Sequence, residues 1–144
     1  IVASMIEKEA KLDVDRPKIA RVIYNRLDID MLLQIDAAVY YGTDVDAPFS
    51  QLRQIDTPYN TYMHHGLPPT PIANPGRASI RAALNPAPDP PPGDPICRDL
   101  PDPTVGCHYV FYVLANDQGG HAFAATEEQH AANVAAARAA GLLG

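Results

Sequence analysis

The sequence lacks the features that identify membrane spans and nucleic-acid binding. No apolar run approaches the roughly 20 residues that cross a bilayer, and no signal peptide is visible. There is no basic stripe either, and the net charge is −6. Because neutralising phosphates requires clustered lysines and arginines, we do not expect nucleic acid among its partners.

Motifs of metal, nucleotide and serine-hydrolase sites are also missing. The five histidines are scattered, nothing resembles HExxH, and GxSxG, P-loop and GxGxxG motifs do not occur. The two cysteines lack the CxxC spacing of zinc sites. The sequence therefore predicts no metal ion and no organic cofactor.

Length and composition indicate one globular domain. The 144 residues suffice for a modest core, and the 15 prolines are about twice the usual share. They cluster in residues 68–75 and 86–103, between flanks that are poor in proline. We expect a single domain over residues 1–144 with long ordered loops. Because the chain begins at Ile1 inside a predicted helix, we interpret it as a fragment of a longer protein.

The two cysteines, Cys97 and Cys107, lie in the second proline-rich segment. A disulfide between them would close a short surface loop and suit an extracytoplasmic setting. The alternative is a pair of free thiols.

The N-terminal part of the chain predicts two amphipathic helices. Apolar side chains fall on one face of a helix over residues 2–12 and of a second helix over about residues 16–28. Asp13 and Asp15 offer N-caps for the second helix, and Pro17 suits its first turn.

The middle of the chain predicts mostly loops. Residues 32–36 read as a short extended segment and residues 37–41 as a helical turn. Residues 43–78 and 86–107 are rich in turn-forming residues, which predicts loops. A short helix is expected over residues 77–84.

The C-terminal part predicts a hairpin followed by a helix. Residues 109–115 carry the clearest strand pattern, and residues 120–125 are expected to pair with them. Thr126 and Gln129 have the spacing of a capping box, and an alanine-rich helix should run to about residue 140. The expected fold class is α+β, with N-terminal helices, long Pro-rich loops, a C-terminal β-hairpin and a final helix.

Glu9 interrupts the apolar pattern of the first helix. It falls on the face of Met5 and Ile6, where a carboxylate loses hydration and its pKa rises. A carboxylic acid that stays protonated near neutral pH is what a general acid for glycosidic cleavage requires. Glu7 lies about 200° around the helix, so we expect it on the solvated side, paired with Lys11.

The roles of Glu9 and His121 leave alternatives open. Glu9 could instead be a structural carboxylate that caps a loop amide or pairs with an arginine such as Arg16, Arg26 or Arg77. His121 follows two glycines at the start of the second predicted strand, where it either faces a cleft or bonds a turn carbonyl.

Aromatic and amide side chains gather in residues 59–62, Tyr-Asn-Thr-Tyr, with His64 and His65 close behind. Sugars are bound by this mixture, since flat rings stack on them and amides bond their hydroxyls. Turn formation explains the same residues equally well. Gln34 and Asp36 are likewise either binding groups or the polar end of a strand.

Residues 1–10, IVASMIEKEA, resemble the catalytic helix of the YceG-like endolytic murein transglycosylases. Further matches, in the family's order, are VIYNRL at 22–27, LQID at 33–36, YYG at 40–42, TPYNTY at 57–62, GLPP at 66–69, PIANPG at 71–76, AALNP at 82–86 and GGHAF at 119–123. Ile35 and Ala37 depart from the family's usual threonine and proline, and residues 97–107 look like an insertion.

The resemblance implies a peptidoglycan lytic transglycosylase. Such an enzyme cleaves the β-1,4 bond from N-acetylmuramic acid to N-acetylglucosamine in nascent strands and leaves 1,6-anhydro ends. The family's essential acid corresponds to Glu9. The resemblance implies substrate-binding roles for Asn25, Gln34, Asp36, Tyr59, Asn60, Tyr62, Asn74 and His121.

The resemblance also implies a setting. In the family, a membrane-spanning anchor and a small LysM-like domain precede the catalytic domain, and neither is present in this chain. We expect an extracytoplasmic location, a parent protein anchored in the bacterial cytoplasmic membrane, and glycan strands and cell-wall synthesis proteins as partners. Two other functions stay open: a muramidase-type hydrolase with water as nucleophile, and a non-catalytic peptidoglycan-binding module.

Overall fold

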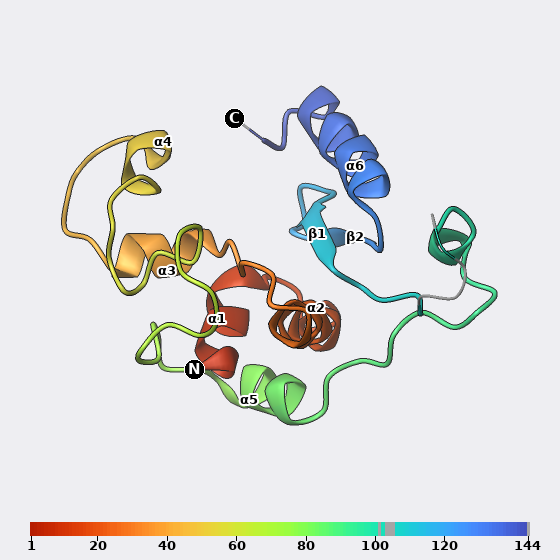
Figure 1. Ribbon diagram of the computed structural model, residues 1–144, viewed down its shortest axis with the longest axis horizontal. Coiled ribbons are helices and arrows are strands. Elements are labelled where there is room, and N and C mark those ends of the chain that lie inside the picture. Colours follow the sequence, from red (N-terminus) through yellow and green to blue (C-terminus); the bar gives the residue numbers. More distant parts are fainter. Residues whose placement is uncertain (101, 103–105, 144) are drawn as a thin grey trace.

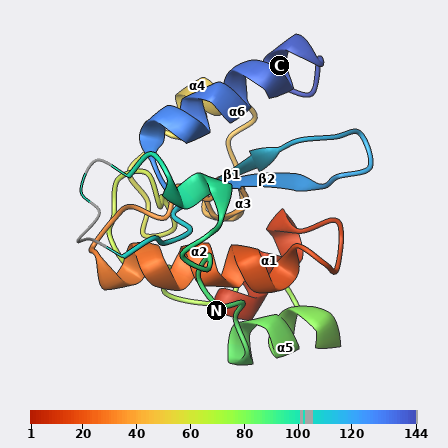
Figure 2. The same cartoon turned by 90° about the vertical axis from the view of Figure 1, so that its right-hand side faces the viewer.

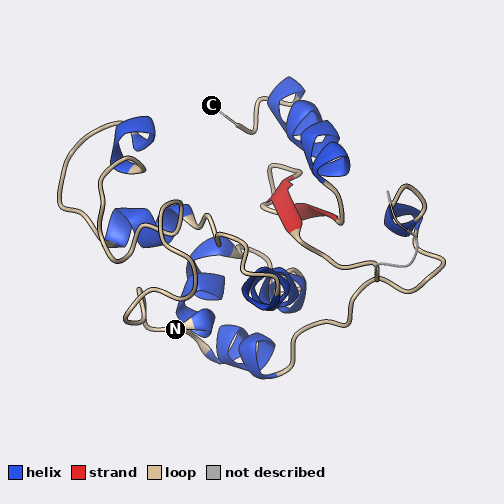
Figure 3. Cartoon of the chain, viewed as in Figure 1, coloured by secondary structure: helices blue, strands red, loops and turns tan. Residues whose placement is uncertain are grey.

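Helices account for most of the regular structure in the computed structural model, which describes residues 1–100, 102 and 106–143. The elements in chain order are α1 (Val2–Glu9), α2 (Arg16–Asp28), α3 (Asp36–Tyr41), α4 (Phe49–Leu52), α5 (Arg77–Leu84), a 3-10 turn (Pro95–Cys97), β1 (Phe111–Leu114), β2 (His121–Ala124) and α6 (Glu127–Ala139). The fold is thus mostly helical and α+β-like, with an antiparallel hairpin and a final helix at its C-terminal end (Figures 1 and 3).

The elements stack around the hairpin. In Figure 2 the hairpin lies between α6 on one side and the pair α1 and α2 on the other, with α5 beyond that pair. Tyr112 pairs with Phe123 and Leu114 with His121 across the two strands. This register brings Tyr112 and His121 close on one face of the hairpin, with ring centroids 5.5 Å apart.

The hydrophobic core joins α1 and α2 to the segment that follows α2. Its buried members are Met5, Ile6, Ala10, Ile19, Ala20, Ile23, Leu33, Ile35, Ala38, Ile72 and Ala82. Met5, Ile6 and Ala10 flank Glu9 in sequence, so the core fixes the end of α1 that carries this residue.

The first helix ends earlier than its periodicity predicts. The prediction of residues 2–12 is wrong at its C-terminal end, because α1 stops at Glu9 and Ala10 is extended, with φ −89° and ψ 121°. Lys11 turns away and packs directly against Gly119 in the hairpin turn. Gly119 has φ +94°, and its lack of a Cβ makes this close approach feasible.

Three further boundaries differ from the sequence-based expectation. Within the extended segment predicted over residues 32–36, Gln34 takes the left-handed φ of +53° and Asp36 already begins α3. The region expected to be loop over residues 43–78 contains α4, whose four residues are too short to give a periodic signal. The strands are shorter than the predicted ranges 109–115 and 120–125.

The C-terminal helix begins with the predicted capping box. Thr126 Oγ1 accepts a bond from the Gln129 backbone N–H at 3.2 Å, and Gln129 Oε1 accepts from the Thr126 N–H at 3.3 Å. These two bonds satisfy free N–H groups at the start of α6. None of the described helices combines the length and the apolar composition that a membrane span needs.

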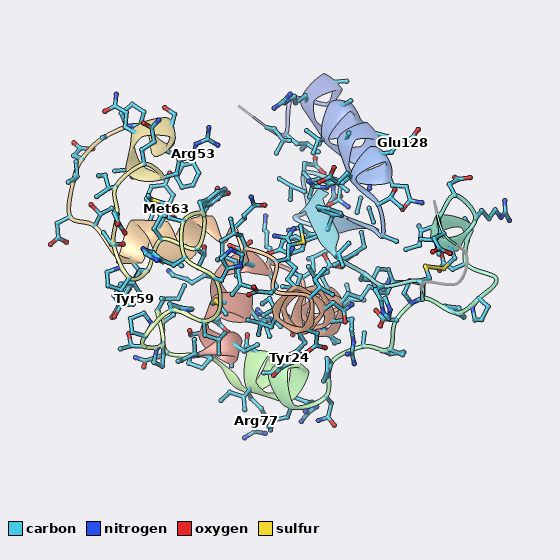
Figure 4. The ribbon with its side chains drawn as sticks, viewed as in Figure 1. Tyr24, Arg53, Tyr59, Met63, Arg77 and Glu128 are labelled. Atoms are coloured by element: carbon cyan, nitrogen blue, oxygen red, sulfur yellow. A yellow bond between two sulfur atoms is a disulfide. The ribbon has the colours of Figure 1, made fainter. Side chains whose placement is uncertain are left out.

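The second proline-rich segment contains a 3-10 turn, Pro95–Cys97, that the sequence did not indicate. Cys97 and Cys107 are joined by a disulfide, seen as a yellow bond at the right of Figure 4. Residues 101 and 103–105 of the predicted loop lie outside the described residues.

Candidate active site

A cavity of about 320 Å³ opens beside Glu9, between the N-terminal helices and the hairpin. Five of the residues predicted for the site line it: Glu9, Gln34, Asp36, Tyr62 and His121. They come from four separate segments of the chain, so the fold brings together residues that are far apart in sequence.

Glu9 stands at the C-terminal end of α1 and is half-buried as a whole residue. Its Oε2 accepts a hydrogen bond of 2.8 Å from the Tyr112 hydroxyl. Burial raises the pKa of Glu9 from 4.5 to about 7, helped by the Asp36 charge and opposed by the Tyr112 bond and the Arg26 charge. The group is therefore poised to give up and take back a proton near neutral pH.

No arginine among the described residues forms an ion pair with Glu9. Arg16 pairs with Asp13 at 2.8 Å and with Glu7 at 3.5 Å. Arg77 extends from α5 at the edge of the molecule (Figure 4). In the described part of the chain, the ion pair of the structural alternative is therefore not formed.

Glu7, two residues earlier, has a different environment from the predicted one. Its Oε2 accepts bonds from the Ser79 hydroxyl at 2.5 Å and from the Gly76 N–H at 3.0 Å, both at the start of α5. These bonds, with Arg16, lower the pKa of Glu7. The predicted pair with Lys11 is wrong, because Glu7 binds the start of α5 and Lys11 lies beyond the helix end, although 32% of the Glu7 side chain stays exposed.

One wall of the cavity carries Asp36 and Tyr62. The backbone N–H groups of Gln34 and Ile35 bond the carbonyl and the hydroxyl of Thr61, at 3.0 and 2.8 Å. This clamp holds the Tyr62 hydroxyl 2.5 Å from Asp36 Oδ1, to which it donates. Burial and the Asp36 carboxylate together raise the pKa of Tyr62 well above its usual range, so the phenol stays a donor.

Arg26 joins the floor of the cavity to the hairpin. Its Nε donates to the Val110 carbonyl at 2.8 Å, and its Nη1 donates to the carbonyls of Leu32 and Leu33 at 3.2 and 2.8 Å. The guanidinium also lies over the Phe111 ring, 5.4 Å from its centroid. Desolvation lowers the pKa of Arg26. Its main role in the fold is to bind three backbone carbonyls at once.

His121 is held by a buried aspartate. Asp15 Oδ2 accepts from the His121 backbone N–H at 2.9 Å and lies 3.0 Å from its Nδ1. Asp15 stands at the N-cap position of α2, as predicted, but its side chain makes no capping bond. Because a carboxylate can only accept, Nδ1 carries the hydrogen of this bond.

Two of the predicted binding residues are engaged in the protein interior. The Asn25 amide donates to Asp89 Oδ1 at 2.8 Å, outside the Glu9 cavity. Asn60 is fully buried and donates to the carbonyls of Arg53 and Ile55, at 2.9 and 2.8 Å. In these bonds both amides stabilise loops.

Tyr59 and Asn74 also lie outside the cavity. The Tyr59 hydroxyl is 2.8 Å from Thr70 Oγ1, and its ring packs on Tyr41 with centroids 5.0 Å apart. Figure 4 shows Tyr59 at the left edge of the molecule, across α3 from the hairpin. Asn74 is exposed in the turn before α5.

Sequence reasoning missed residues that reach the cavity from the C-terminal part. Tyr112 was expected only as a strand residue, and its hydroxyl amid an apolar strand was the one available signal. His130 and Val134 enter from α6. The His130 ring stacks on Phe111 with centroids 4.9 Å apart, and its buried Nδ1 has no hydrogen-bond partner in the described part of the chain. Burial lowers the pKa of His130.

Comparison with known proteins identifies relatives over most of the chain. The model of the YceG-like family matches residues 1–136. The endolytic murein transglycosylase of Bacillus subtilis (strain 168) is 51% identical over 87 residues, which cover 59% of this chain and 24% of that protein. The endolytic murein transglycosylase of Streptococcus pneumoniae (strain R6) is 37% identical over 91 residues, 58% of this chain and 16% of that protein.

A solved structure has the same fold. The 2.6 Å crystal structure of a yceG-like protein from Listeria monocytogenes superposes with a TM-score of 0.71 at 36% sequence identity. The match covers 91% of this chain and 38% of that one. The chain thus spans less than a quarter of the length of the two curated relatives and well under half of the crystallised one.

Proposed function

Because the chain belongs to the YceG-like family, we propose that it is the catalytic domain of a peptidoglycan lytic transglycosylase. Its reaction is cleavage of the β-1,4 bond between N-acetylmuramic acid and N-acetylglucosamine within nascent glycan strands. The new end is a 1,6-anhydro sugar. The curated relatives that support this proposal are named endolytic murein transglycosylases.

The proposal rests on the Glu9 carboxyl group. Its pKa of about 7 means that a large fraction is protonated at neutral pH, which suits a general acid. The Tyr112 hydroxyl donates to Oε2, which leaves Oε1 to carry the acidic proton. No metal ion or organic cofactor is needed for this chemistry.

The first step breaks the glycosidic bond. Glu9 Oε1 donates its proton to the bridging oxygen, the bond from that oxygen to C1 of the muramyl sugar breaks, and the glucosamine leaves with a free 4-hydroxyl. The N-acetyl group of the muramyl sugar steadies the positive charge that develops at C1. Asp36, with its carboxylate held by Tyr62, adds negative potential on the same side of the cavity.

The second step closes the anhydro ring. Glu9, now a carboxylate, accepts the proton of the C6 hydroxyl, and O6 bonds to C1. The nucleophile belongs to the substrate and is already in place, so no second protein nucleophile is needed. Glu9 ends the cycle protonated, and no water is consumed.

The remaining cavity residues are assigned to substrate binding. Gln34, Asp36 and Tyr62 offer an amide, a carboxylate and a phenol from one wall, and the His121 imidazole lines the other. Asp15 acts on the reaction only through His121, as a positioning residue. Asn25, Tyr59, Asn60 and Asn74 remain proposed binding residues by motif, although they lie outside the cavity that Glu9 lines.

A muramidase-type hydrolase is the second candidate, and Asp36 is the observation that favours it. Hydrolases of this kind use two carboxylates, and Asp36 lines the same cavity as Glu9. The mass of the products separates the two reactions. Fragments of uncrosslinked peptidoglycan that lack a water at the new end support transglycosylation, whereas fragments with an added water assign a hydrolase. Binding of peptidoglycan without cleavage would instead identify the chain as a peptidoglycan-binding module.

The same proposal includes the protein's location and organisation. A domain over residues 1–144 that acts on peptidoglycan is placed on the extracytoplasmic side, and the disulfide between Cys97 and Cys107 suits that setting. We propose that it is one part of a longer, membrane-anchored protein that works beside cell-wall synthesis proteins.

A further inference from the structure

Aromatic rings continue from the cavity wall onto the surface of α3 and α4. Tyr62 lines the cavity, and its ring centroid lies 5.8 Å from that of Phe49 in an edge-on contact. The Phe49 ring lies in turn 5.4 Å from the ring of Tyr40. Tyr62 and Phe49 are half-buried, whereas Tyr40 is 54% exposed. The three rings form a continuous set that leads outward from the cavity.

Tyr40, the outermost of these rings, lies on the same face of α3 as Asp36 of the cavity wall. Asp36 and Tyr40 are four residues apart in α3, and such residues lie on one face of a helix, about 6 Å apart along its axis. Asp36 accepts the hydroxyl of Tyr62, and Phe49 bridges Tyr62 to Tyr40. The helix therefore places Tyr40 one step beyond the Glu9 cavity, on a scale comparable to one further sugar.

Tyr41 provides the contrast within the same helix. It is 53% exposed, nearly as much as Tyr40. However, its ring packs on Tyr59, which lies across α3 from the hairpin (Figure 4). Two adjacent tyrosines of equal exposure thus belong to different faces, and only Tyr40 is continuous with the cavity.

We propose that Tyr40, Phe49 and Tyr62 form an extended sugar-binding subsite, which takes a neutral hexosamine of the strand beyond the cleaved bond. The proposal rests on the proposed function of the Glu9 cavity. Flat rings with an apolar face and a polar edge suit pyranose rings, whose C–H faces stack while their hydroxyls stay hydrated. Such a subsite would make cleavage depend on strand length and would favour cuts within a strand over cuts at its end.

A neutral sugar fits this face better than an acidic group. The loop between Tyr40 and Phe49 carries Asp44 and Asp46, whose charges would repel a carboxylate of a peptide stem. The aromatic set also adjoins the polar wall formed by Asp36 and Tyr62, so a strand that leaves the cavity on this side would meet it.

Binding can be separated from cleavage in the Glu9→Gln background. The probes are uncrosslinked glycan strands of graded length, with the stem peptides removed, and the measured quantity is Kd. We expect Tyr40→Ala to weaken binding of long strands roughly five- to tenfold, the scale of one aromatic contact. The shortest strand that fills the Glu9 cavity should bind unchanged. Tyr40→Phe keeps the ring and should restore full affinity.

Tyr41→Ala is the matched control: its ring contacts Tyr59 and not the aromatic set, so the ratio of its affinities for long and short strands should equal that of the parent protein. Equal affinity of the Tyr40→Ala and Tyr41→Ala proteins for long strands would overturn the subsite and leave this face to a protein partner. A penalty that is the same for short and long strands would also overturn it. Failure of the parent Glu9→Gln protein to bind any strand would instead contradict the proposed function itself.

Discussion

The Glu9 carboxyl group and the Tyr112 hydroxyl form one hydrogen-bonded pair across 103 positions of sequence. Burial raises the pKa of Glu9, and the bond from Tyr112 is the largest opposing influence. Tyr112 itself is buried beside an acid, which raises its pKa well above the usual range and keeps it a donor. The pair thus sets the protonation state on which the proposed reaction depends.

Tyr112→Phe should move the pH dependence of cleavage. Removing the hydroxyl takes away the bond that favours the Glu9 carboxylate, so the pKa of Glu9 should rise further above about 7. Since the acid must be protonated, the alkaline limb of kcat/KM should shift to higher pH in the variant. The measurement is a pH–rate profile of both proteins. An alkaline limb that stays in place or moves to lower pH would contradict the assigned pair.

Burial of Glu9 should also make the stability of the fold depend on pH. Its pKa is about 7 in the folded protein and 4.5 when unburied, so the folded state binds the proton more tightly. Proton binding by Glu9 therefore contributes to the free energy of unfolding. This contribution is fully present below pH 4.5 and is lost as the pH rises through 7. The loss amounts to about 3 kcal/mol at most, taking 1.36 kcal/mol for each pH unit.

Glu9→Gln is the natural comparison, because glutamine has nearly the same shape and does not titrate. Urea unfolding of both proteins across this pH range should show the variant gaining stability relative to the wild type as pH rises. A constant difference at all pH values would mean that Glu9 is hydrated and has an ordinary pKa.

At the scale of elements, α2 holds the hairpin and the cavity floor together. Arg26 donates hydrogen bonds to three backbone carbonyls, one before β1 and two in the segment after α2. A guanidinium can do this because its donors form a fixed planar fork, which an ammonium group lacks. Buried carbonyls left without a donor are costly.

Arg26→Lys should therefore destabilise the protein by about 2–3 kcal/mol although the charge is kept. Arg21→Lys is a matched control on the same helix, since Arg21 gives its Nε to the single carbonyl of Ala87 in a partly exposed place. We expect less than about 1 kcal/mol there. Urea unfolding gives both values. Similar losses in the two variants would show that the three Arg26 bonds do not hold the hairpin.

Elements whose signals are local were predictable, and those that depend on distant contacts were not. The capping box of α6 and the apolar face of α2 can both be recognised from residues that are close together in the sequence. By contrast, α1 ends at Glu9, Lys11 beyond it packs against Gly119, and Glu7 binds Ser79 of α5. No local pattern carries either contact.

The same distinction holds for the candidate site. Glu9 was predictable because a carboxylate on an apolar helix face is anomalous within the helix itself. Tyr112 and Arg26 were not assigned, since their roles arise only when the hairpin docks on α2. Asn25 and Asn60 matched a motif, yet their amides bond loops.

On the scale of the whole molecule, the cavity depends on the docking of the C-terminal hairpin and α6 onto the N-terminal helices (Figure 2). Glu9 and Asp36 come from one side, and Tyr112, His121 and His130 from the other. The disulfide lies in a separate region, the proline-rich connection between these two parts. Neither cysteine lines the Glu9 cavity.

Removing the disulfide should affect stability and leave the chemistry intact. Cys97→Ser with Cys107→Ser frees a loop with a separation of 10 residues, and loop-closure entropy then predicts a loss of about 2–3 kcal/mol in unfolding free energy. Cleavage at a temperature where the variant is folded should stay within about twofold, a rate change worth well under 1 kcal/mol. A large loss of cleavage in the folded variant would mean that the loop shapes the active cavity.

The most direct test of the central claim counts the anhydro ends released from uncrosslinked peptidoglycan strands by three proteins. These are the wild type, Glu9→Gln and the control Glu7→Gln, which changes the same residue type in the same helix away from the cavity. If Glu9 is the general acid, Glu9→Gln should lose at least about a hundredfold in rate while Glu7→Gln cleaves like the wild type. Comparable release of anhydro ends by the Glu9→Gln protein would contradict the assignment of Glu9 as the catalytic acid.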